Sequence, residues 1–458
     1  MKKWSLILSL MLVVGLMSAC SNGNGTSTGS NSQPKSNDST ANTSTPASNT
    51  ETTTDTPEEI ELRMMWWGDQ DRADITNKVI ELFEAKYPHI DVIGEFAPSS
   101  GYWDKINTQL ASGTAPDIFF LGGNVVDYAL KGVLLPLDQY VGNELDLSDM
   151  DDSMIQYGTV NGELVHISAG ANARGIVINK TMFEKAGMPI PQDGWSWEDY
   201  GNIATEISEK LGKDAFGTYD FTYDGLDIYF KQHGQQLYLM DEKKIGFDQD
   251  MASQWFNYWS DLSKRGGVVT PELAVSNPSE DIAKNLMVTS QVAMTLLPSN
   301  QLTSLQALTT DELTMVQLPR GPKGTGVVFE SSQGLSGYAK TEHPEAVAQF
   351  ISFFINDSEA ALVLGNNRGV PVTAKNRDVL QAKASDVEKI IYDYTSRVSE
   401  ATKQEPFNIS YNLPGNAEFE KMTKTTIQEI GFGRKSVQEA VASFYKNAQE
   451  IIANNVEQ

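Results

Sequence analysis

Residues 60–121 decide the fold, and they read IELRMMWWGDQDRADITNKVIELFEAKYPHIDVIGEFAPSSGYWDKINTQLASGTAPDIFFL. Three apolar runs in this stretch predict strands, at 60–66, 90–96 and 116–121. Two stretches between them repeat apolar residues every three or four positions and predict helices, at 74–86 and 102–112. This alternation indicates a parallel, doubly wound α/β sheet. Ligands of such sheets bind at the carboxyl ends of the strands, where WWGD at 66–69 and GGN at 122–124 fall.

The α/β pattern continues toward the C-terminus without an internal repeat. Further strands are predicted at 175–180, 291–297 and 334–340, and further helices at 181–187, 195–211 and 343–356. We expect Ser196 to cap the helix that follows it, and the C-terminal segment to be mostly helical. Residues 58–458 are too many for one hydrophobic core, so two domains are expected.

The charge and the single cysteine exclude several classes of protein. The net charge is −25, which argues against nucleic acid as a partner and against attachment to an anionic membrane by a basic surface. Cys20 is the only cysteine of 458 residues, so one chain cannot form a disulfide framework.

The N-terminus has the layout of a secretory signal peptide over residues 1–19. Lys2 and Lys3 precede an uncharged apolar run that is shorter than the ~20 residues of a membrane span. Cys20 after this run resembles the lipidated cysteine of a bacterial lipobox, although Met17 replaces the usual Leu. The alternative is an ordinary cleaved signal with an incidental cysteine. Residues 20–57 are rich in Ser, Thr, Asn and Gly and predict a flexible, lipid-anchored linker.

Enzyme motifs are absent from the sequence. The four histidines, at 89, 166, 233 and 343, are far apart, and no HExxH, CxxC or GxSxG motif occurs. The acidic stretches 69–74 and 241–244 lack the glycine spacing of a calcium loop. We therefore expect no enzyme, no cofactor and no obligatory metal, although paired carboxylates for glycoside cleavage stay open among so many acids.

Eight segments in a characteristic order carry a family resemblance. They are WWGDQDR, ELFEAKYPHIDV, YWDKINTQLASGTAPDIFFL, GIVINKTMFEKAGMPIPQDGWSWEDY, SQVAMTLLPSN, LPRGPKG, SGYAKTEHPEAVAQFISFFINDSEAALVLGNNRGVPV and GFGRKSVQEAVASFYKNA. Together they resemble the family 1 extracellular solute-binding proteins, which include the maltose- and oligosaccharide-binding proteins of ABC importers. Each segment alone is weak, but their number and order cover nearly the whole body of the chain.

The resemblance implies a type II clamshell of two discontinuous α/β lobes. The expected bounds are 58–169 with 324–366 for lobe I, and 170–323 with 367–458 for lobe II. The small residues at 169–174 suit a hinge between the lobes. A mono- or oligosaccharide would bind in the interlobe cleft, the lobes would close on it, and the membrane permease of an ABC importer would receive it.

Candidate ligand contacts combine aromatic faces, which pack on sugar rings, with planar polar groups, which bind hydroxyls. In lobe I, the turn after the first strand supplies Trp66, Trp67, Asp69 and Arg72, and the turn after the third strand supplies Gly123 and Asn124. One of the two tryptophans is expected in the core by strand alternation, and Asn124 could equally sit in a plain turn.

The remaining candidates come from the crossings and from lobe II. They are Asn172, Arg174, Tyr223, Asp224, Asn300, Glu330, Ser332, Gln333 and Arg368. An interlobe salt bridge is an equal alternative for Arg174, and an Asp-Gly turn for Asp224. Relatives often carry an aromatic residue near Asn300, which this chain lacks. Trp255 and Trp259, four residues apart, are expected in the core, and Trp195 and Trp197 at a helix start.

The predicted protein is thus a lipid-anchored monomer on the extracytoplasmic face of a Gram-positive-type cell membrane. Its partners would be a carbohydrate and the permease subunits, with no nucleic acid. Three other classes stay open: a binder of an amine or small peptide in the same fold, an anchored glycosidase or lyase, and a surface sensor or adhesin.

Overall fold

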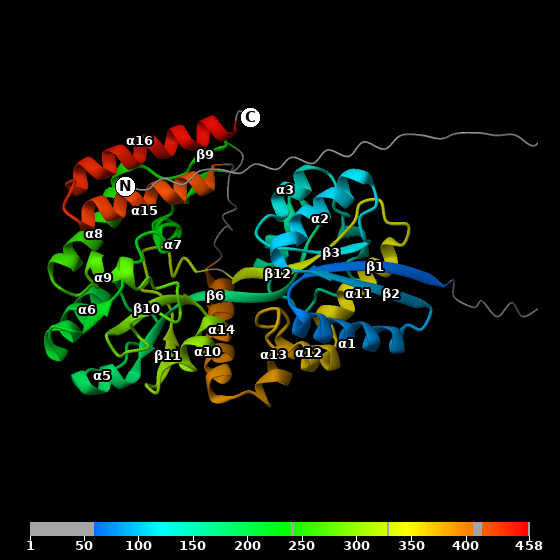
Figure 1. The fold of residues 1–458 in the computed structure, drawn as a ribbon, viewed down its shortest axis with the longest axis horizontal. Coiled ribbons are helices and arrows are strands. Elements are labelled where there is room, and N and C mark those ends of the chain that lie inside the picture. Colours follow the sequence, from blue (N-terminus) through cyan, green and yellow to red (C-terminus); the bar gives the residue numbers. More distant parts are fainter. Residues whose placement is uncertain (1–58, 240–241, 328, 406–414, 457–458) are drawn as a thin grey trace, which may run out of the picture. The chain divides into compact units, whose positions relative to one another are not determined.

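A computed structural model describes residues 59–239, 242–327, 329–405 and 415–456 (Figure 1). The predicted signal peptide, Cys20 and the linker lie outside the described residues.

One mixed sheet runs through the body of the chain. Its strand order is β2-β1-β3-β12-β6-β10-β7, and β11 pairs with β6. The strands are β1 (Ile60–Trp67), β2 (Ile90–Ala97), β3 (Ile118–Leu121), β6 (Ile167–Asn179), β7 (Phe216–Thr218), β10 (Val292–Pro298), β11 (Leu313–Val316) and β12 (Phe329–Gly337). β1 is parallel to β2 and β3, and β10 is parallel to β7, whereas β6 and β12 run antiparallel to their neighbours. The first three predicted strands are confirmed.

The long strand β6 connects the two lobes of the fold. Its first half pairs with β12, which continues to β3, β1 and β2, and its second half pairs with β10 and β11. Figure 1 shows β6 passing from one group of elements to the other. We call the elements around β1–β3 lobe I and those around β7, β10 and β11 lobe II. The residue boundaries of the lobes stay a prediction.

Two predicted strands have wrong bounds. β6 begins at Ile167 rather than at 175, and β12 spans Phe329–Gly337 rather than 334–340. The small and polar residues at 169–174 and 330–333 have low intrinsic β-propensity, and pairing of the two strands with each other overrides it. The predicted hinge segment is therefore part of a continuous strand, and β12 shifts register on either side of Gln333.

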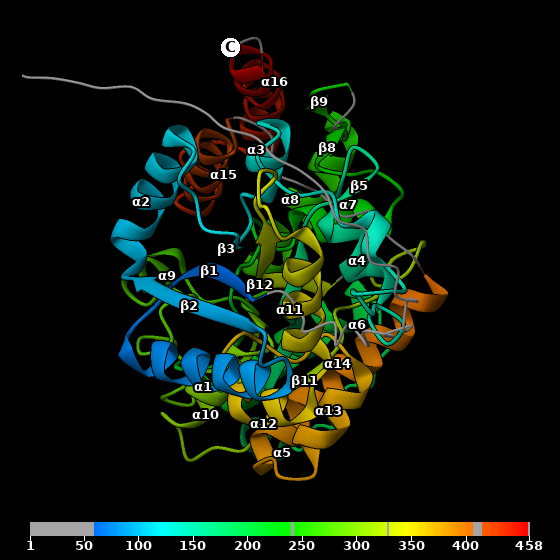
Figure 2. The ribbon, with the colours of Figure 1, turned by 90° about the vertical axis from the view of Figure 1, so that its right-hand side faces the viewer.

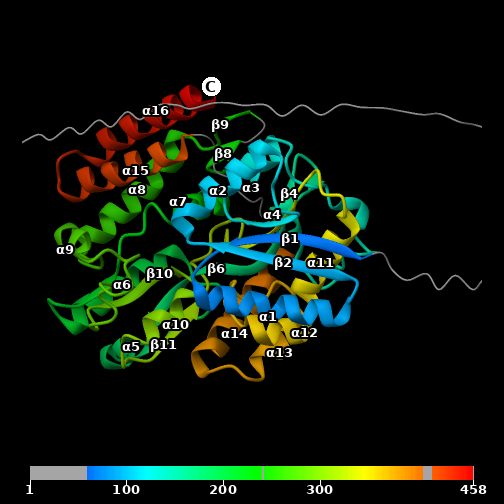
Figure 3. The ribbon, with the colours of Figure 1, turned by 45° about the vertical axis from the view of Figure 1, so that its right-hand side comes forward.

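Helices cover both faces of the lobe I sheet. Figures 2 and 3 show α1 (Gln70–Lys86) on one side of β1 and β2, with α2 (Ser99–Ser112) on the other. The other elements near this lobe are α3 (Val125–Leu130), the 3₁₀ helix η1 (Asp138–Tyr140), α4 (Asp152–Gly158), β4 (Thr159–Val160), β5 (Glu163–Leu164), α11 (Pro344–Asn356), α12 (Ser358–Leu364) and α13 (Ala374–Gln381). α1 packs on α12, and α12 on α11 and α13.

Lobe II includes the long C-terminal helices. α15 (Asn416–Gly431) and α16 (Val437–Val456) pack on each other and on α8 (Gln249–Lys264), as Figures 1 and 3 show. The other elements are α5 (Lys180–Ala186), α6 (Trp197–Leu211), α7 (Leu226–Gln232), β8 (Tyr238–Leu239), β9 (Lys244–Ile245), α9 (Pro271–Ser276), α10 (Gln301–Gln306) and α14 (Asp386–Gln404). Ser196 and Asp199 form a capping box at the start of α6, which confirms the predicted cap.

Four tryptophans of lobe II are buried. Trp255 and Trp259 are buried on α8, as predicted, and Trp195 and Trp197 are buried at the start of α6.

Among the described residues no single helix is long and apolar enough to cross a membrane. The bent pair α11 and α12 reaches that length and composition together, and many of its apolar side chains are buried in the core.

Candidate ligand-binding site

Arg174 lies at the centre of an ion-pair cluster on the crossing strand β6. Its Nε donates to Glu330 Oε1 on β12 at 3.0 Å, and its Nη1 donates to Asp224 Oδ1 at 3.1 Å. The two carboxylates raise the pKa of Arg174 against the opposing effect of burial. Burial raises the pKa of Asp224, and Arg174 partly offsets this. The structure therefore brings together three predicted site residues, in the salt-bridge arrangement that was the alternative for Arg174.

Two amide groups continue the polar face that carries Arg174. Asn172 pairs directly with Glu330 across β6 and β12, and Gln333 pairs with Gly170, so these side chains share one face of the sheet. Both are buried, and neither Asn172 Oδ1 nor Gln333 Oε1 has a hydrogen-bond partner among the described residues. A buried acceptor without a partner costs about 1–3 kcal/mol, so a hydroxyl group that reached either oxygen would remove this cost.

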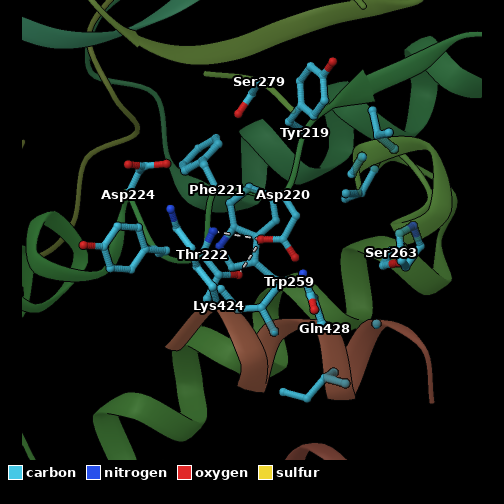
Figure 4. Close-up of a pocket in the computed structure, with 18 of the residues that line it drawn as sticks. Tyr219, Asp220, Phe221, Thr222, Asp224, Trp259, Ser263, Ser279, Lys424 and Gln428 are labelled. Atoms are coloured by element: carbon cyan, nitrogen blue, oxygen red, sulfur yellow. Dashed lines mark hydrogen bonds between the residues drawn. The ribbon is translucent and has the colours of Figure 1, made fainter. Parts of the chain in front are cut away.

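A cavity of about 730 Å³ adjoins this cluster in lobe II (Figure 4). Arg174 lines it together with the loop after β7, which holds Tyr219, Asp220, Phe221, Thr222, Tyr223 and Asp224. Its other walls come from α8, from the segment around α9 and from α15. Figure 4 shows Lys424 and Gln428 of α15 along one side. The loop follows the carboxyl end of β7, a position where α/β sheets bind ligands.

Aromatic rings form much of the cavity wall. Phe221 and Trp259 pack edge to face, with ring centroids 4.5 Å apart. Lys424 pairs with Glu420 at 2.8 Å and lies 5.2 Å from the centre of the Tyr223 ring. Burial is the main cause that raises the pKa of the Tyr223 phenol, and Glu420 adds to it. The phenol therefore stays neutral, and the ring offers a face and a hydroxyl to a bound molecule.

A second polar group occupies the strand ends of lobe I. Arg72 Nε donates to Asn367 Oδ1 at 3.2 Å, and Arg368 Nη1 donates to the same oxygen at 3.0 Å. Arg368 is buried, lies 4.9 Å from the centre of the Phe120 ring, and donates to Thr76 Oγ1 at 2.6 Å. Burial, with Arg72 nearby, lowers the pKa of Arg368 to about 9. Arg368 is therefore a structural support behind Arg72.

The other lobe I candidates have different environments. Trp66 is 1% exposed and belongs to the core, whereas Trp67 is partly buried against Tyr102, Trp103 and Phe120. Strand alternation thus assigns one tryptophan to the core, as expected.

Three lobe I candidates lie in turns. Asp69 is exposed and caps α1 by accepting from the Arg72 amide. Asn124 precedes α3 and accepts from the Gly122 amide at 3.3 Å. Gly123 is exposed, and an added Cβ would meet no described atom within 4 Å.

Ser332 connects the two polar groups. Its hydroxyl lies within hydrogen-bond distance of the Gly170 and Arg368 carbonyls. An added Cβ on Gly170 would lie 2.1 Å from the Arg368 carbonyl oxygen, so only glycine allows this approach. Glu330, Ser332 and Gln333 were expected before a strand, and they lie within β12 instead. Asn300 is exposed at the start of α10, and the Ser299 amide before it donates to the Ala173 carbonyl at 2.9 Å.

The structure adds residues that the sequence reasoning missed. Asp220 and Phe221 belong to the same loop as the predicted Tyr223 and Asp224, within the segment DFTYDG at 220–225, and this closeness in sequence was the available signal. Glu420 and Lys424 lie in a stretch that carried no local motif, whereas Asn367 lies in one of the eight family segments without having been chosen as a contact. Trp259 was assigned to the core, and it also lines the cavity, with its indole Nε1 lacking a partner among the described residues.

The described residues hold no group of three or more His, Cys, Asp and Glu side chains placed to bind a metal ion.

Comparisons with known proteins identify the family to which the chain belongs. Residues 69–361 match the family described as bacterial extracellular solute-binding protein. A family 1 extracellular solute-binding protein from Alicyclobacillus acidocaldarius subsp. acidocaldarius DSM 446 is 26% identical, with a TM-score of 0.78 over 87% of this chain and 100% of that chain. A periplasmic oligogalacturonide binding protein from Yersinia enterocolitica, solved with saturated digalacturonic acid, is 25% identical, with a TM-score of 0.67 over 87% and 100%.

One further relative was found by its sequence rather than by its structure. The multiple sugar-binding protein of Streptococcus mutans serotype c (strain ATCC 700610 / UA159) is 23% identical over 154 residues, which are 33% of this chain and 35% of that protein. The matched family consists of binding proteins rather than enzymes and acts outside the cytoplasm, which confirms those two predictions. The chain therefore belongs to the bacterial extracellular solute-binding proteins and has their two-lobed α/β fold.

Proposed function

We propose that this solute-binding protein binds a mono- or oligosaccharide and delivers it to the permease of an ABC importer, and that lipid on Cys20 anchors it to the membrane. The observation that carries the sugar assignment is the composition of the cavity beside Arg174. It combines aromatic faces with carboxylate, hydroxyl and guanidinium groups, which is the mixture that pyranose rings and their hydroxyls require.

The size of the cavity supports a small or medium-sized ligand. Its volume of about 730 Å³ falls within the roughly 300–1,000 Å³ range of small-molecule sites. Arg174, Asp224 and Tyr223 line it, and Arg174 lies two positions from Asn172 along β6. A ligand that fills the cavity would thus also reach the strand that joins the lobes.

A ligand that contacts both lobes would favour their closure. Arg72 and Trp67 of lobe I could contact one part of a ligand, while Tyr223 and Asp224 of lobe II hold another. A ligand that contacts both lobes lowers the free energy of the closed form relative to the open form. The permease would read that closed form as the loaded state.

The names of two relatives support the sugar assignment. The Yersinia protein is an oligogalacturonide binding protein, and the Streptococcus protein is a multiple sugar-binding protein. Anchoring rests on the sequence before residue 59, where Cys20 follows the apolar run. Two or more acyl chains on one cysteine would hold the protein stably at a membrane.

A thermal-shift screen of the purified protein tests the proposal. Neutral, acidic and amino mono- and oligosaccharides are added separately, with amino acids and short peptides as a second set. At a concentration 100 times its Kd, a bound ligand stabilises the folded state by about 2.7 kcal/mol, so its melting temperature rises. A rise with at least one sugar is expected. A rise only with amino acids or peptides, or release of shorter sugars during incubation, would contradict the proposal.

A further inference from the structure

Asp220 is a deep carboxylate of the cavity that has no cationic partner. Its Oδ1 accepts from the Thr222 amide at 2.8 Å and from the Thr222 hydroxyl at 2.6 Å. Among the described residues no lysine, arginine or histidine forms an ion pair with it. Burial raises the pKa of this carboxyl group. A carboxylate placed in this way favours a positive charge that the protein itself does not supply.

Three basic side chains line the cavity, and each of them is already paired with a carboxylate other than Asp220. Arg174 binds Asp224 and Glu330, Lys424 binds Glu420, and Lys264 binds Asp261 at 3.0 Å. The four carboxylates of the wall are Asp220, Asp224, Glu280 and Glu420. Since Glu330 and Asp261 add two more from outside the wall, the neighbourhood carries an excess of negative charge. An anionic sugar would therefore be repelled here.

The surroundings of Asp220 suit a cation that is attached to a hydroxylated ring. The ring of the next residue, Phe221, packs against Trp259, and aromatic faces attract ammonium groups by about 0.5–2 kcal/mol. Trp259 lines the cavity, and its buried Nε1 has a proton to donate but no acceptor among the described residues. Figure 4 shows Asp220, Thr222 and Trp259 among the residues of this wall. A simple alkylamine would satisfy Asp220 alone, whereas an amino sugar also offers an oxygen to the indole.

We infer that the cavity binds an amino sugar, whose protonated amine pairs with Asp220 and whose oxygen accepts from Trp259 Nε1. This inference rests on the proposed sugar-binding function and narrows its ligand class. The same excess of carboxylates disfavours uronates of the kind bound by the Yersinia relative.

The test is a calorimetric titration of the purified protein with four matched probes. D-glucosamine and its β-1,4-linked dimer carry a protonated amine, and glucose and cellobiose carry a hydroxyl at the same position. The amino probes are expected to bind at least tenfold more tightly than their hydroxyl counterparts. Asp220→Asn should remove most of this preference, because the amide keeps the shape of the side chain but carries no charge.

Asp261→Asn is the matched control. It removes the same unit of negative charge from the exposed end of α8 without touching Asp220. The amine preference should survive this change. Equal affinities for amino and neutral sugars, or a preference that Asp220→Asn leaves intact, would overturn the inference while the sugar-binding proposal stands. If no carbohydrate of any charge binds, the proposed function fails as well. Thermal denaturation of each variant verifies that it folds.

Discussion

Replacing Arg174 by methionine should separate ligand binding from stability. The Arg174 side chain is 29% exposed, and the side chains of its partners Asp224 and Glu330 are 41% and 47% exposed. Because all three groups reach solvent, each ion pair contributes only about 0.2–1 kcal/mol to folding. The free energy of unfolding should therefore fall by about 1 kcal/mol, and the melting temperature by no more than about 4 °C.

Binding should suffer much more from Arg174→Met than folding does. Arg174 donates a hydrogen bond to Asp224, and both residues line the cavity. A hydrogen bond to a charged group is worth about 1.5–3 kcal/mol, so the loss of one such contact with the sugar raises Kd at least tenfold. Calorimetric titration with the tightest sugar of the thermal-shift screen measures this effect.

Arg397→Met is the matched control for Arg174→Met. Arg397 also pairs with two carboxylates, Asp193 and Asp393, and is 35% exposed, but it does not line the cavity. It should cost a similar amount of stability and leave Kd unchanged. If Arg174→Met lowers the unfolding free energy by more than about 3 kcal/mol and leaves Kd unchanged, Arg174 is a structural ion pair only and the reasoning is refuted.

Three further predictions concern single positions. Trp259→Phe should lower the unfolding free energy less than Trp195→Phe, because Trp195 Nε1 donates to the Gln317 carbonyl at 2.8 Å, whereas Trp259 Nε1 has no partner among the described residues. Sugar binding should be weaker in Trp259→Phe and unchanged in Trp195→Phe. Gly170→Ala should lower the unfolding free energy by at least about 1–3 kcal/mol in urea denaturation, because its Cβ would meet the Arg368 carbonyl; an unchanged midpoint would refute that close approach.

The third is that Asp220→Asn should be more stable than the native protein at neutral pH. Burial raises the folded-state pKa of Asp220, so the native chain gains stability as pH falls through that pKa, and the advantage of the variant should shrink there. A pH-independent difference in urea denaturation would contradict this.

The sequence predicted local structure well where one signal dominated. Apolar spacing located α1 and α6, and Ser196 forms the expected capping box. The expectation that one of Trp66 and Trp67 lies in the core is confirmed, although Met64, Met65 and Trp66 are buried in succession rather than alternately. These features depend on neighbours within a few residues, so they can be recognised in one chain.

The long crossing strands were not predictable in the same way. Residues 169–174 are small or polar, and they are extended because β12 pairs with them from more than 150 positions away. The same non-local pairing places Glu330 beside Asn172 and within reach of Arg174. Asn172, Arg174 and Glu330 were expected in connecting segments, but they lie in β6 and β12. The structure nevertheless brings these three candidates together.

The cavity depends even more on distant segments. Lys424 of α15 meets the Tyr223 ring, and Trp259 of α8 meets Phe221. Periodicity assigned Trp259 to the core, which is correct for its ring, but it could not show that Nε1 lacks a partner. Whether a buried polar atom is satisfied depends on every segment around it.

A crystal structure of the complex with the tightest-binding sugar of the screen tests the central claim most directly. A sugar ring is predicted in the cavity of lobe II, against the Tyr223 ring and within hydrogen-bond distance of Arg174 or Asp224. A sugar bound elsewhere on the protein, with this cavity free of ligand, would contradict the account.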